Sequence, residues 1–208
     1  MYVSRVLIAD DHALARAGYR QFLEAESSIS NIGEAGSFAE ALDALGRNRW
    51  DLMILDINMP DRNGFDILAE VKAHHPHTRV LVISGFSEDQ YAENVLKAGA
   101  SGYLSKGSAP NELMHAVRTV LSGRRYRSDE ARAKSAEPNS ELPHTELSNR
   151  EFQIFLKLAA GGSVTAIAAE LELNVKTVST FRGRILAKLH MQSNADLTAY
   201  ALKNGLMH

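Results

Sequence analysis

Polar side chains stand where several apolar segments of this sequence end. Asp10 and Asp11 follow the run VLIA, and Asp56 follows the run LMIL. Ser84 follows VLVI, and Lys106 follows GYLS. Burying an unpaired carboxylate costs considerable free energy, so an acid at the end of a buried strand needs a capping role, a metal ion or a chemical task.

If these ends share one edge of a sheet, the chemistry that they support is phosphoryl transfer. Crowded carboxylates repel one another, and Mg²⁺ is the divalent cation that best suits such oxygen ligands. Asp56 would then be a nucleophile that forms an acyl phosphate, while Mg²⁺ and Lys106 neutralise charge on the transferred oxygens and Ser84 donates to one of them. The candidate metal ligands are Asp10, Asp11, Asp56 and the backbone carbonyl of Asn58.

Each of these residues also has an ordinary structural explanation. Asp11 could cap a helix, Asp56 could begin a turn, and Lys106 could be a solvated loop lysine. Together these explanations require a coincidence at four separate strand ends, so we favour a site that receives phosphate.

The elements that must position these residues alternate along the first 123 residues. Five apolar or β-branched runs are each followed by an amphipathic segment. The runs are VLIAD, SISNIGEAG, DLMILD, RVLVISG and SGYLSKG. Strand and helix in alternation predict an α/β domain, a parallel five-stranded sheet with helices on both faces. In such sheets, ligands bind at the carboxyl ends of the strands.

The pattern changes after residue 123. The next residues are polar and contain two prolines, which indicates a linker with a short helix around 128–136. From residue 147 the periodicity is helical only, in segments near 148–160, 163–171, 174–190 and 193–204. The expected organisation is an α/β domain at 1–123, a linker at 124–146 and an all-α four-helix domain at 147–208.

The third helical segment carries a second candidate site. It follows the preceding helix after a tight turn, which predicts a helix-turn-helix. Residues 174–190 hold four Lys and Arg and no acid, and the side chains opposite the apolar face suit the major groove of DNA. The alternative is a merely solvated helix face. The candidate DNA contacts are Lys176, Thr177, Ser179, Thr180, Arg182, Gly183, Arg184 and Lys188.

Gly183 is unusual among these candidates. A glycine inside a helix costs about 1 kcal/mol relative to alanine, so its missing side chain is consistent with a close approach to DNA.

The motifs of the first domain resemble those of the two-component response regulators. The matching pieces are ADDH at 9–12, LDINMPDRNG at 55–64, ISG at 83–85 and GASGYLSKG at 99–107. The resemblance implies a flavodoxin-like receiver domain that takes phosphate from a sensor histidine kinase on Asp56, with Lys106 sensing the phosphate. It also implies that Ser84 and Tyr103 form the switch pair, although Tyr103 could equally be a core aromatic with its hydroxyl in solvent.

Residues 147–189 resemble the LuxR-type DNA-binding domain of the NarL/FixJ subfamily. The resemblance implies that Ser179, Thr180 and Gly183 face base edges, and that Lys176, Arg182, Arg184 and Lys188 hold phosphates. Phe181 stands where the family often has histidine, which puts one backbone contact in doubt. The resemblance also implies a homodimer when phosphorylated. The last helix offers Leu197, Ala201 and their neighbours as a candidate dimer stripe.

Composition excludes several other classes of protein. The chain has 208 residues and no cysteine, so disulfides, thiolate metal sites and cysteine nucleophiles are excluded. No apolar run approaches the roughly 20 residues that span a bilayer, so we expect a cytoplasmic protein with no membrane partner.

The sequence therefore predicts a transcription factor controlled by phosphorylation, with promoter DNA as its target, and not an enzyme. One alternative is a phosphorylation-independent DNA-binding regulator with an inert receiver. Another is a phosphatase of the haloacid dehalogenase type, but such enzymes place a second acid two residues after the nucleophile, where this chain has Asn58.

Overall fold

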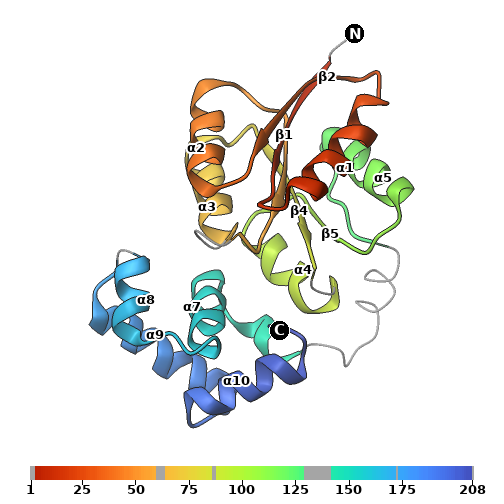
Figure 1. Ribbon diagram of the computed structural model, residues 1–208. Helices are drawn as coiled ribbons and strands as arrows, with labels where there is room; N and C mark the ends of the chain where they lie inside the picture. Colours follow the sequence, from red (N-terminus) through yellow and green to blue (C-terminus); the bar gives the residue numbers. More distant parts are fainter. Residues whose placement is uncertain (1–2, 60–63, 86–87, 129–141, 172, 208) are drawn as a thin grey trace.

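A parallel sheet forms the N-terminal half of the computed structural model, which describes residues 3–59, 64–85, 88–128, 142–171 and 173–207 (Figure 1). The strands lie in the order β2-β1-β3-β4-β5, and every neighbouring pair is parallel. This confirms the predicted fold of the first domain. The strands are β1 (Ser4–Ala9), β2 (Ile29–Ala35), β3 (Leu52–Asp56), β4 (Arg79–Ser84) and β5 (Gly102–Ser105).

Helices cover both faces of this sheet, as Figure 1 shows. Successive residues of the central strands enter two different cores, Leu7 and Met53 on one face and Ile8 and Ile54 on the other. This alternation explains why the strand sequences are apolar throughout. The covering helices are α1 (Ala13–Glu24), α2 (Phe38–Arg47), α3 (Gly64–His74), α4 (Glu88–Lys97) and α5 (Pro110–Leu121).

The second half of the chain is helical, as predicted. After a 3₁₀ turn, η1 (Pro143–Glu146), come α7 (Asn149–Ala159), α8 (Val164–Glu170), α9 (Val175–Lys188) and α10 (Asn194–Lys203). Each of these four helices begins after a side-chain cap, because the oxygens of Ser148, Ser163, Asn174 and Ser193 accept a backbone N–H from the first turn. None of the described helices combines the length and hydropathy needed to cross a membrane.

The segment between the two halves begins beside the sheet. Tyr126 is buried and forms a parallel bridge with Gly102, so the chain runs along β5 before it leaves. Most of the short helix predicted near 128–136 lies outside the described residues. The domain boundaries predicted from the sequence remain predictions.

One interpretation of the last helix is wrong. Leu197 and Ala201 are fully buried in the core of the helical domain, so they cannot form an outer dimer stripe. The sequence shows apolar residues on several sides of α10, and it does not show which side packs against α7. The exposed side instead carries Ala195, Ala199 and Leu202.

The two halves share an aromatic contact. The Phe152 ring of α7 packs edge-to-face against Phe65 of α3 and Tyr91 of α4, with centroids 5.8 and 5.3 Å apart. The Tyr91 hydroxyl donates to the carbonyl of Leu206, 2.9 Å away, just beyond α10. These contacts join the sheet domain to the helical domain through α3 and α4.

Polar groups complete this contact. The amide of Asn94 donates to the His144 carbonyl at 3.3 Å, and the Lys97 ammonium donates to the Thr145 carbonyl at 2.9 Å. At the start of α3, Asp66 accepts a hydrogen bond from the side chain of Gln153. Helix α4 therefore holds both η1 and α7, whereas α3 holds α7.

Candidate acidic site and nucleic-acid interface

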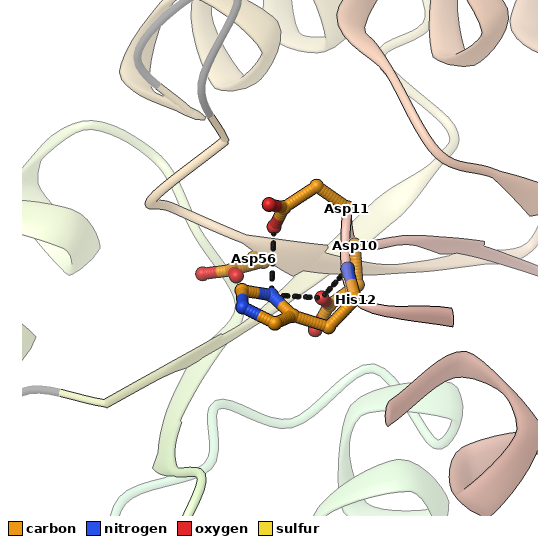
Figure 2. A group of neighbouring side chains, drawn as sticks. All are labelled: Asp10, Asp11, His12 and Asp56. Atoms are coloured by element: carbon orange, nitrogen blue, oxygen red, sulfur yellow. Dashed lines mark hydrogen bonds and ion pairs between the residues drawn. The ribbon is translucent and has the colours of Figure 1, made fainter. Parts of the chain in front are cut away.

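The carboxyl ends of β1 and β3 bring the predicted acids together (Figure 2). Ala9 lies opposite Leu55 in the register of the two strands, so the residues that follow are neighbours. Asp10 is 1% exposed and Asp56 is 2% exposed, while Asp11 lies nearer the surface. Ligand atoms of these three acids and of His12 all lie within 4.8 Å of one another, so this group could hold a metal ion.

Lys106 joins the two buried acids. Its Nζ lies 2.7 Å from Asp56 Oδ2 and 2.8 Å from Asp10 Oδ2. The lysine follows β5, and its backbone N–H donates to the carbonyl of Ser84 at the end of β4. Asp56 Oδ1 also accepts the backbone N–H of Asn58 at 2.9 Å. The sheet thus brings the predicted acids, the lysine and the serine to one edge.

At this edge, the single positive charge of Lys106 does not fully offset the cost of burying the carboxylates. Burial raises the pKa of Asp56, and the Lys106 hydrogen bond opposes that rise without cancelling it. Burial alone would lower the pKa of Lys106, but the hydrogen bonds to Asp10 and Asp56 outweigh it and raise that pKa. The lysine therefore stays charged, and the buried carboxylates gain from any further positive charge.

His12, the residue after Asp11, also takes part in the cluster. Its ring is exposed, yet Nδ1 lies 2.9 Å from Asp11 Oδ1 and 3.3 Å from Asp10 Oδ1 (Figure 2). Its backbone N–H also donates to Asp10 Oδ1 at 2.8 Å. The residue covers the acids from the solvent side.

Arg16 on α1 was not identified from the sequence. Its Nη1 donates to the backbone carbonyl of Asp10 at 2.7 Å, and its Nε donates to Glu34 at 3.2 Å. Arg20, one turn later, also pairs with Glu34 but reaches the Ile32 carbonyl instead. Arg16 thus fixes the backbone of Asp10, whereas Arg20 does not contact that residue. The only feature of the sequence that points to Arg16 is its position one helical turn after His12.

An open cavity of about 590 Å³ lies beside the acidic site. Asp56 and Lys106 line one part of it, and Leu14, Gly18 and Phe22 of α1 line another. These three α1 residues are spaced four apart, so they form one stripe along the helix. Leu14 is 87% exposed, and no described part of the chain covers it. An exposed apolar side chain beside a cavity is a candidate contact for a partner.

The predicted switch residues are buried. Ser84 and Tyr103 are both fully inaccessible to solvent, and Tyr103 belongs to the core that also contains Tyr91 and Phe152. The alternative in which the Tyr103 hydroxyl lies in solvent is therefore wrong. The switch role itself stays a prediction.

The predicted DNA-binding face of α9 is well separated from its core face. Val178, Ile185 and Leu186 are buried in the helical domain. The opposite face is exposed and carries most of the predicted contacts, Lys176, Thr177, Ser179, Thr180, Gly183 and Arg184.

Two predicted phosphate contacts on α9 already have partners within the chain. Arg182 is half-buried, and its Nε donates to Asn194 Oδ1 at 2.7 Å. The Nζ of Lys188 lies 2.6 Å from the buried carboxylate of Glu151. That ion pair lowers the pKa of Glu151, although burial opposes the effect. The DNA-binding roles of Arg182 and Lys188 stay predictions. The ion pair with Glu151 weighs against a phosphate contact by Lys188.

The chain matches two family models. Residues 6–118 match the response regulator receiver domain, and residues 145–201 match the bacterial regulatory proteins of the luxR family. It is 35% identical to the response regulator UvrY of Escherichia coli over 97% of this chain and 94% of that protein. It is also 35% identical to the response regulator GacA of Pseudomonas protegens, over 98% of this chain and 97% of that one.

Solved structures of RcsB share the fold over nearly the whole chain. RcsB from Salmonella enterica serovar Typhimurium, bound to the promoter rprA with the phosphomimetic BeF₃⁻, gives a TM-score of 0.81 at 24% identity, covering 95% of this chain and 98% of that chain. A structure of two RcsB dimers bound to two parallel DNAs gives 0.74 at 25% identity, covering 95% and 98%.

Proposed function

Because this chain belongs to the response regulators that join a receiver domain to a LuxR-type DNA-binding domain, we propose that it is a transcriptional regulator controlled by phosphorylation of Asp56. The observation that carries this proposal is the ion pair between Asp56 and Lys106, formed 2.7 Å apart beside Asp10 at a buried sheet edge. A buried acid beside a paired cation and a second acid supplies the nucleophile and the charge stabilisation that phosphoryl transfer uses.

The phosphoryl donor in this proposal is a phosphohistidine of a sensor histidine kinase. A carboxylate oxygen of Asp56 attacks phosphorus as the bond between phosphorus and the histidine nitrogen breaks, and the freed imidazole takes up a proton. Lys106 stays within reach to neutralise a phosphoryl oxygen, and Ser84 at the end of β4 can donate to another. The apolar α1 stripe of Leu14, Gly18 and Phe22 lines the same cavity, which suits a helical surface of the kinase.

Mg²⁺ fits the donor set at this edge. Carboxylate and carbonyl oxygens are its preferred protein ligands, and ligand atoms of Asp10, Asp11 and Asp56 lie within 4.8 Å of one another. Asp10, Asp11, Asp56 and the carbonyl of Asn58 would hold it. When bound, the ion would neutralise negative charge that develops on the transferred group.

The effect of phosphorylation would reach the helical domain through two segments. One leads from Asp56 to α3, whose Phe65 contacts Phe152. The other leads from Ser84 to α4, whose Tyr91 bonds the Leu206 carbonyl. We infer that a shift of Ser84, Lys106 and Tyr103 toward the phosphoryl group changes both contacts and so changes how the DNA-binding domains pair.

DNA recognition would use the exposed face of α9 in the major groove of promoter DNA. RcsB, a similar protein, has been solved as dimers bound to DNA, and we infer a homodimer here as well. A regulator of this kind works beside the chromosome, so we place it in the cytoplasm. We also propose that it is not an enzyme acting on an external substrate, because the helix-turn-helix would serve no such reaction.

The test is a selection of binding sites from random duplex DNA, with Mg²⁺ and with or without beryllofluoride. We expect a two-fold symmetric site that is enriched mainly with the phosphoryl mimic. Equal enrichment without the mimic, and equal enrichment by Asp56→Asn, would instead support the regulator with an inert receiver. Enrichment of no site would reject DNA binding altogether.

A further inference from the structure

Gly183 occupies the middle of α9, a helix of 14 residues. Glycine is a poor residue for a helix interior because it loses more conformational freedom on folding than alanine does. Its backbone is helical, and it is not among the glycines of positive φ. The backbone conformation therefore does not require glycine at this position.

Packing within the chain does not require glycine here either. A Cβ placed at Gly183 would meet no heavy atom within 4 Å. The situation differs at Gly64, where a Cβ would lie 2.5 Å from the Cα of Ile57, and at Gly162, where it would lie 2.8 Å from the Lys157 carbonyl. At those two positions the fold explains the glycine, whereas at Gly183 the described structure contains nothing that a side chain would disturb.

The position of Gly183 on the helix indicates what a side chain would disturb instead. Lys176, Ser179 and Thr180 precede it by seven, four and three residues, so they lie on the same face. All of these residues are exposed. The Thr180 hydroxyl donates to the Lys176 carbonyl at 2.9 Å, so this side chain bonds to the helix that carries it. The two residues one turn before Gly183 on this face, Ser179 and Thr180, therefore have short side chains, and Lys176 lies two turns before it.

Groove dimensions make a missing side chain useful. An α-helix with its side chains is about 10–12 Å across, and the major groove of DNA is about 12 Å wide, so the fit is close. At a glycine the surface of the helix lies near the backbone cylinder, whose Cα radius is about 2.3 Å. The helix can enter more deeply where it has a glycine than where it has any other residue.

We propose that Gly183 is the point of closest approach between α9 and DNA, and that it determines specificity by letting Ser179 and Thr180 reach base edges. This inference rests on the proposed function, because it requires DNA as the partner. It predicts that the same substitution stabilises the free protein and weakens its complex with DNA.

The test compares Gly183→Ala with Gly46→Ala in the full chain. Gly46 is also exposed and helical, lies at the end of α2, and has no heavy atom within 4 Å of the point where an added Cβ would lie. We expect both variants to unfold at the same temperature as the wild type or higher. The dissociation constant for the site selected by the wild type should rise at least tenfold for Gly183→Ala, and stay within twofold for Gly46→Ala.

A second pair of variants separates steric exclusion from loss of flexibility. Gly183→Asn adds a side chain of poor helix propensity, and Gly183→Leu adds one of good propensity. If a side chain holds the helix away from DNA, both should bind more weakly than Gly183→Ala. If Gly183 serves as a flexible joint, Gly183→Asn should bind better than Gly183→Ala, and the inference is overturned.

Other outcomes also decide the matter. Binding by Gly183→Ala within twofold of the wild type overturns this inference and leaves the proposed function intact. Failure of the wild type to select any duplex rejects the proposed function, and this inference with it. A repeated selection with Gly183→Ala that yields a changed preference at a few base pairs supports the role in specificity.

Discussion

The acidic edge of the sheet and the exposed face of α9 are organised in opposite ways. At the sheet edge, Asp10 and Asp56 are almost wholly buried, and one lysine bonds both. On α9, Lys176 and Arg184 are exposed, and their side chains lie apart from the core. Chemistry at a fixed atom needs groups that are positioned before the partner arrives, whereas a charged polymer can be bound by many exposed groups, each of small effect.

The comparison predicts large effects from single changes at the sheet edge and small ones on α9. Glycine is the exception on α9, since its contribution is the absence of a side chain. The following substitutions test this contrast, from the largest expected effect to the smallest.

The largest effect should come from Asp56→Asn. The amide is too weak a nucleophile to accept a phosphoryl group, so incubation with acetyl phosphate and Mg²⁺ should give no acyl phosphate, as measured by intact mass. Asp43→Asn, which changes an exposed acid of α2, is the matched control and should be phosphorylated normally. A normal yield from Asp56→Asn would show that the acceptor is another residue.

A smaller effect, roughly a tenfold rise in the Mg²⁺ dissociation constant, should follow Arg16→Ala. The change frees the Asp10 carbonyl, and loss of a group that orients a metal ligand typically weakens metal binding by about 10–100-fold. Calorimetric titration of the unphosphorylated protein measures it. Arg20→Ala is the control, because Arg20 shares the Glu34 partner but not the Asp10 contact. Equal losses in the two variants would contradict a specific role for Arg16.

The ionised Asp56 carboxylate should lower the stability of the folded protein at neutral pH. Since burial raises the pKa of Asp56 above its unfolded value, the fold favours the protonated acid, and stability falls as the pH rises through the folded pKa. Without divalent cations, Asp56→Asn should therefore be more stable than the wild type at pH 7.

Two conditions should reduce this difference in stability. Lowering the pH below the unfolded pKa of aspartate protonates Asp56 in both states, and Mg²⁺ supplies positive charge at neutral pH. Urea unfolding at several pH values, with and without Mg²⁺, measures both. A wild type more stable than Asp56→Asn at pH 7 without Mg²⁺ would show that Lys106 outweighs burial.

The smallest effect should come from Lys176→Ala. Loss of one phosphate contact should weaken DNA binding a few-fold and reduce the slope of log affinity against log salt by about 0.9. Arg47→Ala removes another exposed positive charge, on α2, and should leave the slope unchanged. If the slope is unchanged for Lys176→Ala as well, Lys176 does not contact a phosphate.

The sheet and its acidic edge could be predicted from sequence because strand ends are local signals. An apolar run that stops at a polar residue marks a strand end, and parallel strands carry their ends to one edge. The partners of Arg16 and Lys188 could not be predicted in this way. One is a backbone carbonyl, which no residue type reveals, and the other is Glu151, which lies 37 residues away from Lys188 in the chain.

The error on α10 has a related cause. Leu197 and Ala201 are apolar at helical spacing, and so are Ala195, Ala199 and Leu202. Periodicity shows that a helix has an apolar side, but two such sides cannot be assigned to core and surface without the neighbouring helix. The contact of Phe152 with Phe65 and Tyr91 was equally hidden, because it joins residues that are far apart in sequence.

That aromatic contact has a consequence for how the protein is made. The sheet domain leaves the ribosome first, and α3 and α4 then present Phe65 and Tyr91 without the ring that covers them. The nascent chain exposes this aromatic patch until α7 has been synthesised and has docked. A chaperone that recognises exposed aromatic side chains would have its longest opportunity during that interval, and slow codons between the two domains would prolong it.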